Sequence, residues 1–282
     1  MIIETVGIVG AGTMGQGIAQ AVAMAGYRVI IFDVKEAILK LALEKIDQNL
    51  DKGIEKGKLT LEQKEIALSN IVTRNKIQNV TGDLVIEAIV EDLQVKVDLF
   101  SRLEEINSTQ TIFASNTSSI PISRIGAQLK NPGRLAGLHF FNPAHIMKLV
   151  EVIKAKDTYP ETIEVITEFT KSIGKVAVAA ADTPGFIVNR VARQYYLEGL
   201  KILEGRIASH ETIDDLLENY GFRMGPFKLM DLIGVDTNFA VTRSIYESFG
   251  YQSKFKPNNI QQRLVEEGHY GRKTGKGFYE YK

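Results

Sequence analysis

Apolar runs alternate with stretches of helical periodicity along the first 183 residues of the chain. The helical stretches include 92–106 and 160–173, where apolar residues recur every three or four positions. Short runs rich in Val, Ile and Ala, which are typical of buried strands, lie at 5–9, 28–32, 71–74, 84–89, 111–114, 134–139 and 176–180. This alternation predicts an α/β fold built on a doubly wound, Rossmann-type sheet.

The segment between residues 33 and 71 is instead helical through most of its length. Gly57 interrupts it, and Thr60 followed by Gln63 has the sequence of a capping box that opens a second helix. The pattern predicts a helical hairpin that projects from the sheet domain. Its apolar positions before Gly57 recur near the helical period: Ile38, Leu41, Ile46, Leu50 and Ile54.

Lys52 and Lys56 are four residues apart, so they share one face of the first helix of this hairpin. Two interpretations fit the pair. The lysines form a solvated surface, or they form a docking surface for the phosphates of a large substrate.

A change of pattern after the last predicted strand divides the chain. Asp182-Thr183-Pro184-Gly185 interrupts the alternation, and no strand pattern follows until the last few residues. We therefore expect two domains, 1–183 and 184–282, of which the second is all-helical. Its predicted helices cover 186–204, 211–220, 227–232 and 236–249.

Composition excludes several classes of function. The 34 basic and 34 acidic residues balance, so we expect no general attraction to nucleic acid or anionic membranes. The chain contains no cysteine, and its four histidines (139, 145, 210 and 269) lack metal-ligand spacing, so we expect no metal site. The chain enters a strand directly, without a signal peptide, and no apolar run is long enough to span a bilayer. We therefore expect a cytoplasmic location.

The first predicted strand ends in the glycine-rich sequence Gly10-Ala11-Gly12-Thr13-Met14-Gly15. In a dinucleotide-binding turn the first glycine permits a tight turn, the second lets backbone approach a pyrophosphate, and the third lets helix and strand pack closely. The anion binds the unpaired N–H groups that begin the helix. This spacing predicts a nicotinamide or flavin dinucleotide site. The alternative is an ordinary glycine-rich strand–helix turn.

Asp33 follows the second predicted strand, eighteen residues after Gly15. A carboxylate at this position accepts hydrogen bonds from the ribose hydroxyls of the cofactor. Because it would repel a 2′-phosphate, we expect NAD rather than NADP. Lys35 lies close enough in sequence to shield such a phosphate, which leaves NADP as the less favoured alternative.

His139 ends a predicted strand, and ligands of open α/β sheets bind outside the carboxyl ends of strands. Glu151 lies twelve residues later in a short strand-like apolar run, where an unpaired charge would be costly. We expect the two side chains to pair, so that Glu151 orients the imidazole and makes it a better base. A purely structural histidine is the alternative.

Two further polar segments are candidates for the same site. Ser115-Asn116-Thr117-Ser118-Ser119 closes another predicted strand and offers hydroxyls and amides there, or is simply a polar turn before Pro121. Asn189 begins the helical domain, either facing a cleft or capping a helix.

Together these motifs resemble the 3-hydroxyacyl-CoA dehydrogenases. The resemblance runs in order from Ile3 to Tyr279, and the length is most similar to the bacterial monofunctional 3-hydroxybutyryl-CoA dehydrogenases. It rests on G-A-G-T-M-G at 10–15, S-N-T-S-S at 115–119, H-F-F-N-P at 139–143, K-L-V-E-V at 148–152, D-T-P-G-F-I-V-N-R at 182–190 and M-G-P-F-K-L-M-D at 224–231.

The resemblance implies a role for each matching residue. His139 is expected to be the general base for the 3-hydroxyl proton, with Glu151 as its electrostatic partner. Ser118 and Asn189 are expected to bind the reacting oxygens. The positions expected to bind NAD are Gly10, Gly12, Thr13, Met14, Gly15, Asp33, Glu91, Lys96, Asn116, Asn142 and Lys273.

The resemblance also implies a partner and an assembly. Lys52 and Lys56 fall where the projecting helices of the family meet coenzyme A, which favours the docking interpretation of this pair. The substrate is then an acyl-CoA, the helical domain mediates a homodimer, and the active site lies between the domains. Butyrate formation, polyester precursor supply and fatty-acid oxidation are all compatible with this resemblance.

Two other functions remain open from the sequence. One is a related dehydrogenase of a free hydroxy acid, of the L-gulonate 3-dehydrogenase type, which needs no basic docking surface. The other is a dinucleotide-binding protein without turnover. The joint presence of His139, Glu151, Ser118 and Asn189 disfavours the second.

Overall fold

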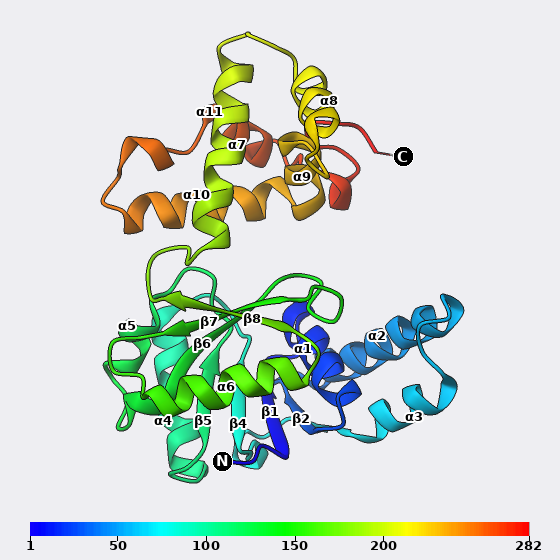
Figure 1. The fold of residues 1–282 in the computed structure, drawn as a ribbon, viewed down its shortest axis with the longest axis vertical. Helices are drawn as coiled ribbons and strands as arrows, with labels where there is room; N and C mark the ends of the chain where they lie inside the picture. Colours follow the sequence, from blue (N-terminus) through cyan, green and yellow to red (C-terminus); the bar gives the residue numbers. More distant parts are fainter. Residues whose placement is uncertain (282) are drawn as a thin grey trace. The chain divides into compact units, whose positions relative to one another are not determined.

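The computed structural model describes residues 1–281, which form two compact units that meet in sequence between Thr183 and Pro184 (Figure 1). Lys282, the last residue of the expected second domain, lies outside the described residues. The first unit combines a sheet with helices, and the second is helical. The expected fold class, a doubly wound sheet followed by helices, is confirmed.

The described strands of the first unit form one eight-stranded sheet in the order β3-β2-β1-β4-β5-β6-β7-β8. Neighbouring strands are parallel except β6 and β7, which are antiparallel. The strands are β1 (Thr5–Val9), β2 (Arg28–Phe32), β3 (Ile71–Arg74), β4 (Leu84–Glu87), β5 (Ile112–Ser115), β6 (Leu135–Phe140), β7 (Leu149–Lys154) and β8 (Val176–Ala181).

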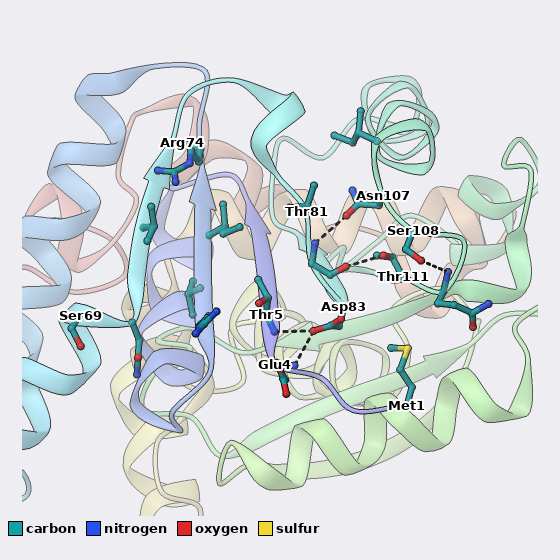
Figure 2. A pocket seen from close by; sticks show the side chains of 18 residues that line it. Met1, Glu4, Thr5, Ser69, Arg74, Thr81, Asp83, Asn107, Ser108 and Thr111 are labelled. Atoms are coloured by element: carbon teal, nitrogen blue, oxygen red, sulfur yellow. Dashed lines mark hydrogen bonds between the residues drawn. The ribbon is translucent and has the colours of Figure 1, made fainter.

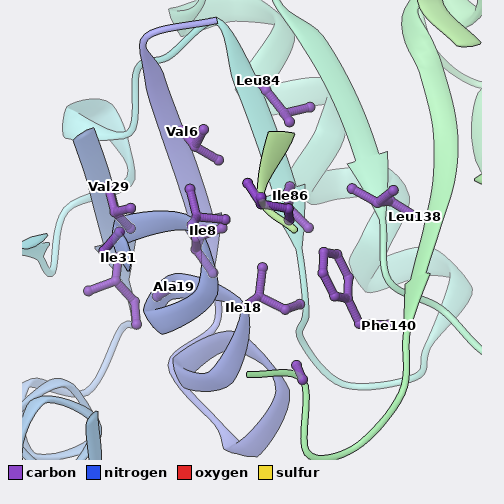
Figure 3. Close-up of a cluster of buried hydrophobic side chains, with 14 of the residues drawn as sticks. Val6, Ile8, Ile18, Ala19, Val29, Ile31, Leu84, Ile86, Leu138 and Phe140 are labelled. Atoms are coloured by element: carbon purple, nitrogen blue, oxygen red, sulfur yellow. The ribbon is translucent and has the colours of Figure 1, made fainter. Parts of the chain in front are cut away.

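Helices cover both faces of this sheet. Ile18 of α1 and Phe169 of α6 share one buried cluster with alternate strand residues such as Ile8 and Ile86, part of which is drawn in Figure 3. On the opposite face, Phe100 of α4 packs edge-on against Phe113 of β5. The helices of this unit are α1 (Thr13–Met24), α2 (Glu36–Glu55), α3 (Leu61–Ser69), α4 (Leu93–Ile106), α5 (Ile122–Gly126) and α6 (Pro160–Ser172).

The helical hairpin is formed by α2 and α3, which extend beyond the sheet (Figure 1). The predicted capping box is present: the Thr60 hydroxyl accepts from the Gln63 N–H, and the Gln63 side chain accepts from the Thr60 N–H. Gly57 has φ +65°, the left-handed conformation that favours glycine at a turn. Lys64 of α3 joins the two helices through an ion pair with Asp51 of α2.

The sheet differs from the sequence prediction in two places. Residues 149–154 form a full strand, β7, although only a short strand-like run was expected there. The carboxylate of Glu151 interrupts the apolar pattern that would indicate a strand in the sequence. Pairing with β6 stabilises this strand. Strand β4 ends at Glu87 rather than Ile89, because the Glu87 side chain accepts the Ile89 N–H and the backbone leaves the sheet.

The second unit packs its helices around a small core that includes Leu200, Phe227 and Met230. Two buried carboxylates, Asp214 and Asp231, hold the last residues against this core. Helix α11 was not predicted, because its sequence is mostly polar. The helices are α7 (Val188–Glu204), α8 (His210–Tyr220), α9 (Pro226–Ile233), α10 (Val235–Ser248) and α11 (Asn259–Glu266). Among the described residues, no helix has the length and apolar character needed to cross a membrane.

Candidate active site

The glycine-rich turn follows β1, at the point where the chain order of the sheet reverses between β1 and β4. Such switch points are the usual ligand sites of open α/β sheets. Gly10 has φ +100° and donates its N–H to the carbonyl of Phe32 at 2.8 Å. A Cβ atom on Gly15 would overlap the carbonyl oxygen of Gly10, so this helix can pack so closely only with glycine here.

The space beside this turn fits a dinucleotide pyrophosphate. Within residues 1–281, no side chain caps the N-terminus of α1, so its first N–H groups remain able to bind an anion. A Cβ atom on Gly12 would meet no heavy atom of the described chain within 4 Å, so backbone and ligand can approach there. The Asp33 carboxylate accepts the Ala11 N–H at 3.1 Å, which fixes it beside the turn.

His139 and Glu151 lie directly opposite each other in the antiparallel pair of β6 and β7. The His139 Nδ1 and a Glu151 carboxylate oxygen are 2.7 Å apart, and the two side chains are only 7% and 1% exposed. The Phe141 ring packs against the imidazole, with centroids 4.6 Å apart. Parallel strands β1, β4, β5 and β6 bring the end of His139's strand to the same sheet edge as the glycine turn. The pairing expected from the sequence is present.

The turn after β5 is tied down at both ends. Asn116 accepts the Phe140 N–H at 2.8 Å through its side-chain oxygen, which links this turn to the strand of His139. The other end is held by Glu91, one of whose carboxylate oxygens accepts hydrogen bonds from Thr117, Ser118 and Ser119. Glu91, expected only in the cofactor site, therefore also holds the backbone of the candidate substrate residue Ser118.

Lys96 lies beneath Glu91 rather than on the surface. Its side chain is 1% exposed and contacts Glu87 at 2.5 Å and Glu91 at 3.3 Å. Burial raises the pKa of Glu91, but the Lys96 ammonium and the hydroxyls of Thr117 and Ser119 outweigh burial and hold this pKa below its usual range. Sequence reasoning did not assign Glu87 to the site. A carboxylate that closes a buried strand was the available signal, because it requires a cationic partner.

A basic cavity of about 610 Å³ lies between α1, the hairpin and the loop after β6. It contains both predicted lysines, Lys52 and Lys56, together with Asn142 and Thr13. Two lysines that were not predicted, Lys45 and Lys58, also line it, and no acidic side chain is among its described lining residues. Lys45, Lys52 and Lys56 recur at helical spacing, which was a signal in the sequence.

His145 lines the same cavity on the loop after β6. Burial lowers the pKa of His145, and the neighbouring Lys175 ammonium lowers it further. Lys175 is buried and donates to the carbonyls of Ala144 and Met147, at 2.7 and 2.9 Å. It therefore fixes the loop that forms one wall of the cavity.

A second hollow, of about 780 Å³, lies at the amino ends of the strands, the edge opposite the glycine turn (Figure 2). Several of its polar side chains accept hydrogen bonds from backbone N–H groups. Asp83 accepts the N–H groups of Glu4 and Thr5, and the Asn107 side chain accepts the Gly82 N–H. This hollow has a structural role rather than a chemical one, although it is larger than the basic cavity.

Two predicted site residues, Asn189 and Lys273, belong to the second unit. Asn189 lies in the first turn of α7, and its carbonyl accepts from Arg193. Lys273 forms an ion pair with Asp236. The other predicted residues belong to the first unit. Across the part of the chain that the structure describes, no cluster of His, Cys, Asp and Glu is suited to hold a metal ion.

Comparison with known proteins supports one family over both units. The 3-hydroxyacyl-CoA dehydrogenase NAD-binding domain matches residues 5–183, and the C-terminal domain of the same family matches residues 185–281. A 3-hydroxyadipyl-CoA dehydrogenase of Escherichia coli is 46% identical over 99% of this chain, which spans only 59% of that protein. The mitochondrial hydroxyacyl-coenzyme A dehydrogenase of Sus scrofa is 41% identical over 100% of the chain and 92% of its own length.

Solved structures agree with the sequence matches. The crystal structure of (S)-3-hydroxybutyryl-CoA dehydrogenase from Ralstonia eutropha superposes with a TM-score of 0.95 at 37% identity, over the full length of both chains. The glycine turn therefore belongs to an NAD-binding domain. The chain belongs to the 3-hydroxyacyl-CoA dehydrogenase family.

Proposed function

We propose that the chain interconverts (S)-3-hydroxyacyl-CoA and 3-oxoacyl-CoA with NAD(H), and that its substrates are short-chain, 3-hydroxybutyryl-CoA and acetoacetyl-CoA. The observation that carries this proposal is the buried His139–Glu151 pair at the sheet edge that also holds the NAD-binding turn. The pair supplies a base beside a hydride acceptor, which is what oxidation of a secondary alcohol requires.

His139 exchanges the proton of the reaction in this proposal. With Nδ1–H donating to Glu151, the lone pair that accepts the 3-hydroxyl proton is on Nε2. The carboxylate of Glu151 then stabilises the imidazolium that forms. NAD held at the glycine turn would supply the hydride acceptor for C3 in oxidation, and NADH the hydride donor in reduction. Since reduction consumes a proton, acid favours reduction and alkali favours oxidation.

The remaining predicted residues orient the substrate. The Ser118 hydroxyl and the Asn189 amide hydrogen-bond the reacting oxygens. Lys52 and Lys56 bind phosphates of coenzyme A. The basic cavity, with four lysines and no acidic side chain among its described lining residues, favours an acyl-CoA over a free hydroxy acid.

The decisive experiment is oxidation of NADH by the purified protein with acetoacetyl-CoA, followed by nicotinamide absorbance. We expect rapid turnover that requires the thioester. Activity only with free acetoacetate, or only with L-gulonate and NAD, would assign the chain to a free hydroxy acid. NADH binding without turnover of any of these would identify a protein that binds the dinucleotide but does no chemistry.

A further inference from the structure

A chain of charges runs from the buried end of β4 to the turn that carries Ser118, where its last member is 37% exposed. Its members are Glu87, Lys96 and Glu91, which we call the carboxylate relay. Glu87 and Lys96 are 0% and 1% exposed, so water cannot replace either partner. Because an uncompensated buried charge is costly, the positions of Glu87 and Lys96 depend on each other, and Lys96 in turn meets Glu91 at 3.3 Å.

Glu87 is the fixed end of the carboxylate relay. One of its oxygens accepts the Ile89 N–H at 2.7 Å and contacts the Lys96 ammonium, and the other accepts the Ser115 hydroxyl at 2.6 Å. These bonds come from two adjacent strand ends and one helix. The ammonium lies closer to Glu87 than to Glu91, so Glu87 sets where Lys96 meets Glu91.

Glu91 is the end of the carboxylate relay that meets the site. One oxygen faces Lys96, while the other accepts from the backbone N–H groups of Ser118 and Ser119, both at 3.1 Å. The hydroxyls of Thr117 and Ser119 donate to that same oxygen, at 2.6 and 2.7 Å. Glu91 therefore links Lys96 to the backbone of Ser118 and Ser119.

We propose that Glu87 is a positioning residue for the reaction, acting through Lys96 and Glu91 to hold the Ser118 hydroxyl in place. This inference rests on the proposed function, in which Ser118 binds the reacting oxygen. Glu87 itself lies inside the protein and touches neither substrate nor cofactor. Its effect on catalysis must therefore disappear when the Ser118 hydroxyl is absent.

A double-mutant cycle with Glu87→Gln and Ser118→Ala tests this dependence. Ser118→Ala keeps the backbone N–H that Glu91 binds and removes only the hydroxyl. At saturating NADH, we expect Glu87→Gln to lower kcat/KM for acetoacetyl-CoA about tenfold in the wild-type background and less than about twofold in the Ser118→Ala background. Equal losses in both backgrounds would show that Glu87 acts through the fold or the cofactor site, and would overturn the proposal.

Asp83→Ala is the matched control. Asp83 precedes the other end of β4 and also accepts two backbone N–H groups, but far from the turn of Ser118. We expect a lower Tm with kcat/KM unchanged in both backgrounds. If Glu87→Gln does not fold, Glu87→Asp keeps the charge and shortens the side chain that meets Lys96. It must show a smaller loss with the same dependence on Ser118, and equal losses in both backgrounds would again overturn the proposal.

The outcomes separate the two proposals. Wild-type protein that does not reduce acetoacetyl-CoA contradicts the proposed function, and the positioning role fails with it. Active wild-type protein whose Ser118→Ala variant keeps full kcat/KM contradicts the positioning role of Glu87 and the role of the Ser118 hydroxyl, but leaves the proposed reaction standing. Active protein with additive losses from Glu87 and Ser118 contradicts the positioning role alone.

Discussion

The role proposed for His139 depends on Glu151, the residue that faces it on the neighbouring strand. Antiparallel register places Glu151 against the imidazole at 2.7 Å, and a shift of one residue would turn it to the other face of the sheet. Both side chains are buried, so the carboxylate is little screened by water and orients one tautomer of the ring.

We expect His139→Gln to lower kcat by about 10²–10⁴-fold while leaving the Kd for NADH close to wild type, since it removes only the proton acceptor. Glu151→Gln should also lower kcat, because the amide no longer stabilises the imidazolium. Steady-state rates and NADH fluorescence titration measure the two effects. His269→Gln, at a histidine paired with Glu267 in the second unit, is the control and should be neutral. Near-normal kcat in the His139 variant would exclude it as the base.

Asp33 is expected to decide the choice between the two nicotinamide cofactors. Its carboxylate is fixed by the N–H groups of Ala11 and Lys35, so it cannot turn away from a 2′-phosphate. We expect kcat/KM to be higher for NADH than for NADPH, because two like charges would be close in a partly desolvated site. Lys35→Ala should widen the difference if that ammonium shields a phosphate. A preference of the wild-type protein for NADPH would refute the assignment.

At the scale of elements, the hairpin of α2 and α3 gives one wall of the basic cavity its charge. We expect the double variant Lys52→Ala/Lys56→Ala to raise KM for acetoacetyl-CoA several-fold, which corresponds to about 0.5 kcal/mol for each exposed contact, and to raise it less at high salt. KM for NADH should change little. Lys40→Ala, on the same helix but not among the residues that line the cavity, is the matched control.

A truncated substrate separates binding from folding in this experiment. Turnover of an acetoacetyl-pantetheine thioester, which lacks the nucleotide, should not respond to the two lysine changes. Equal losses on both substrates would mean that the lysines support the fold. No loss on either would leave them as a solvated surface.

The C-terminal segment of the second unit depends on two tyrosine hydroxyls. Tyr279 donates to Asp214 and Tyr281 donates to Asp231, both at 2.9 Å. Burial, together with the hydrogen bond to Asp231, raises the pKa of Tyr281 from 10.0 to about 12. Burial and Asp214 raise the pKa of Tyr279 as well.

These raised pKa values predict a loss of stability in alkali. The folded protein keeps both protons above the pH at which the unfolded chain releases them, so their contribution is complete below about pH 10 and declines as pH rises toward the folded pKa values. We expect Tm to fall over this range. Tyr281→Phe should start with a lower Tm at neutral pH and lose less of it in alkali. An equally steep fall in Tyr281→Phe would show that other groups cause the decline.

At the scale of the whole molecule, we expect the second unit to mediate a homodimer. Several large apolar side chains of this unit are exposed, and burial against a second copy would remove their apolar surface from water. Light scattering of the purified protein should give about twice the chain mass of 31.3 kDa. A monomer at micromolar concentration would contradict this expectation. The exposed side chains include Val191, Ile207, Leu216, Tyr220, Phe222 and Tyr251.

The sequence by itself determined the features that depend on local pattern. Gly10 and Gly15 predicted the dinucleotide-binding turn, because only glycine fits the backbone at these two positions. Thr60 and Gln63 predicted the start of the second hairpin helix, because capping is a local interaction. The sequence signal for the strand that contains Glu151 was weaker, because a charged residue interrupts the apolar pattern expected of a buried strand.

Only the tertiary structure decided the charge pairs around Glu87 and Glu91. In the sequence, Glu87 is only a carboxylate at the end of a predicted strand. The structure shows that Lys96 from a helix and Ser115 from the neighbouring strand both donate hydrogen bonds to it. Glu91 is likewise a loop carboxylate until the turn of Ser118 meets it. Long-range electrostatic pairs leave no periodic trace in sequence, because what fixes them is the packing of elements rather than the conformation of any one of them.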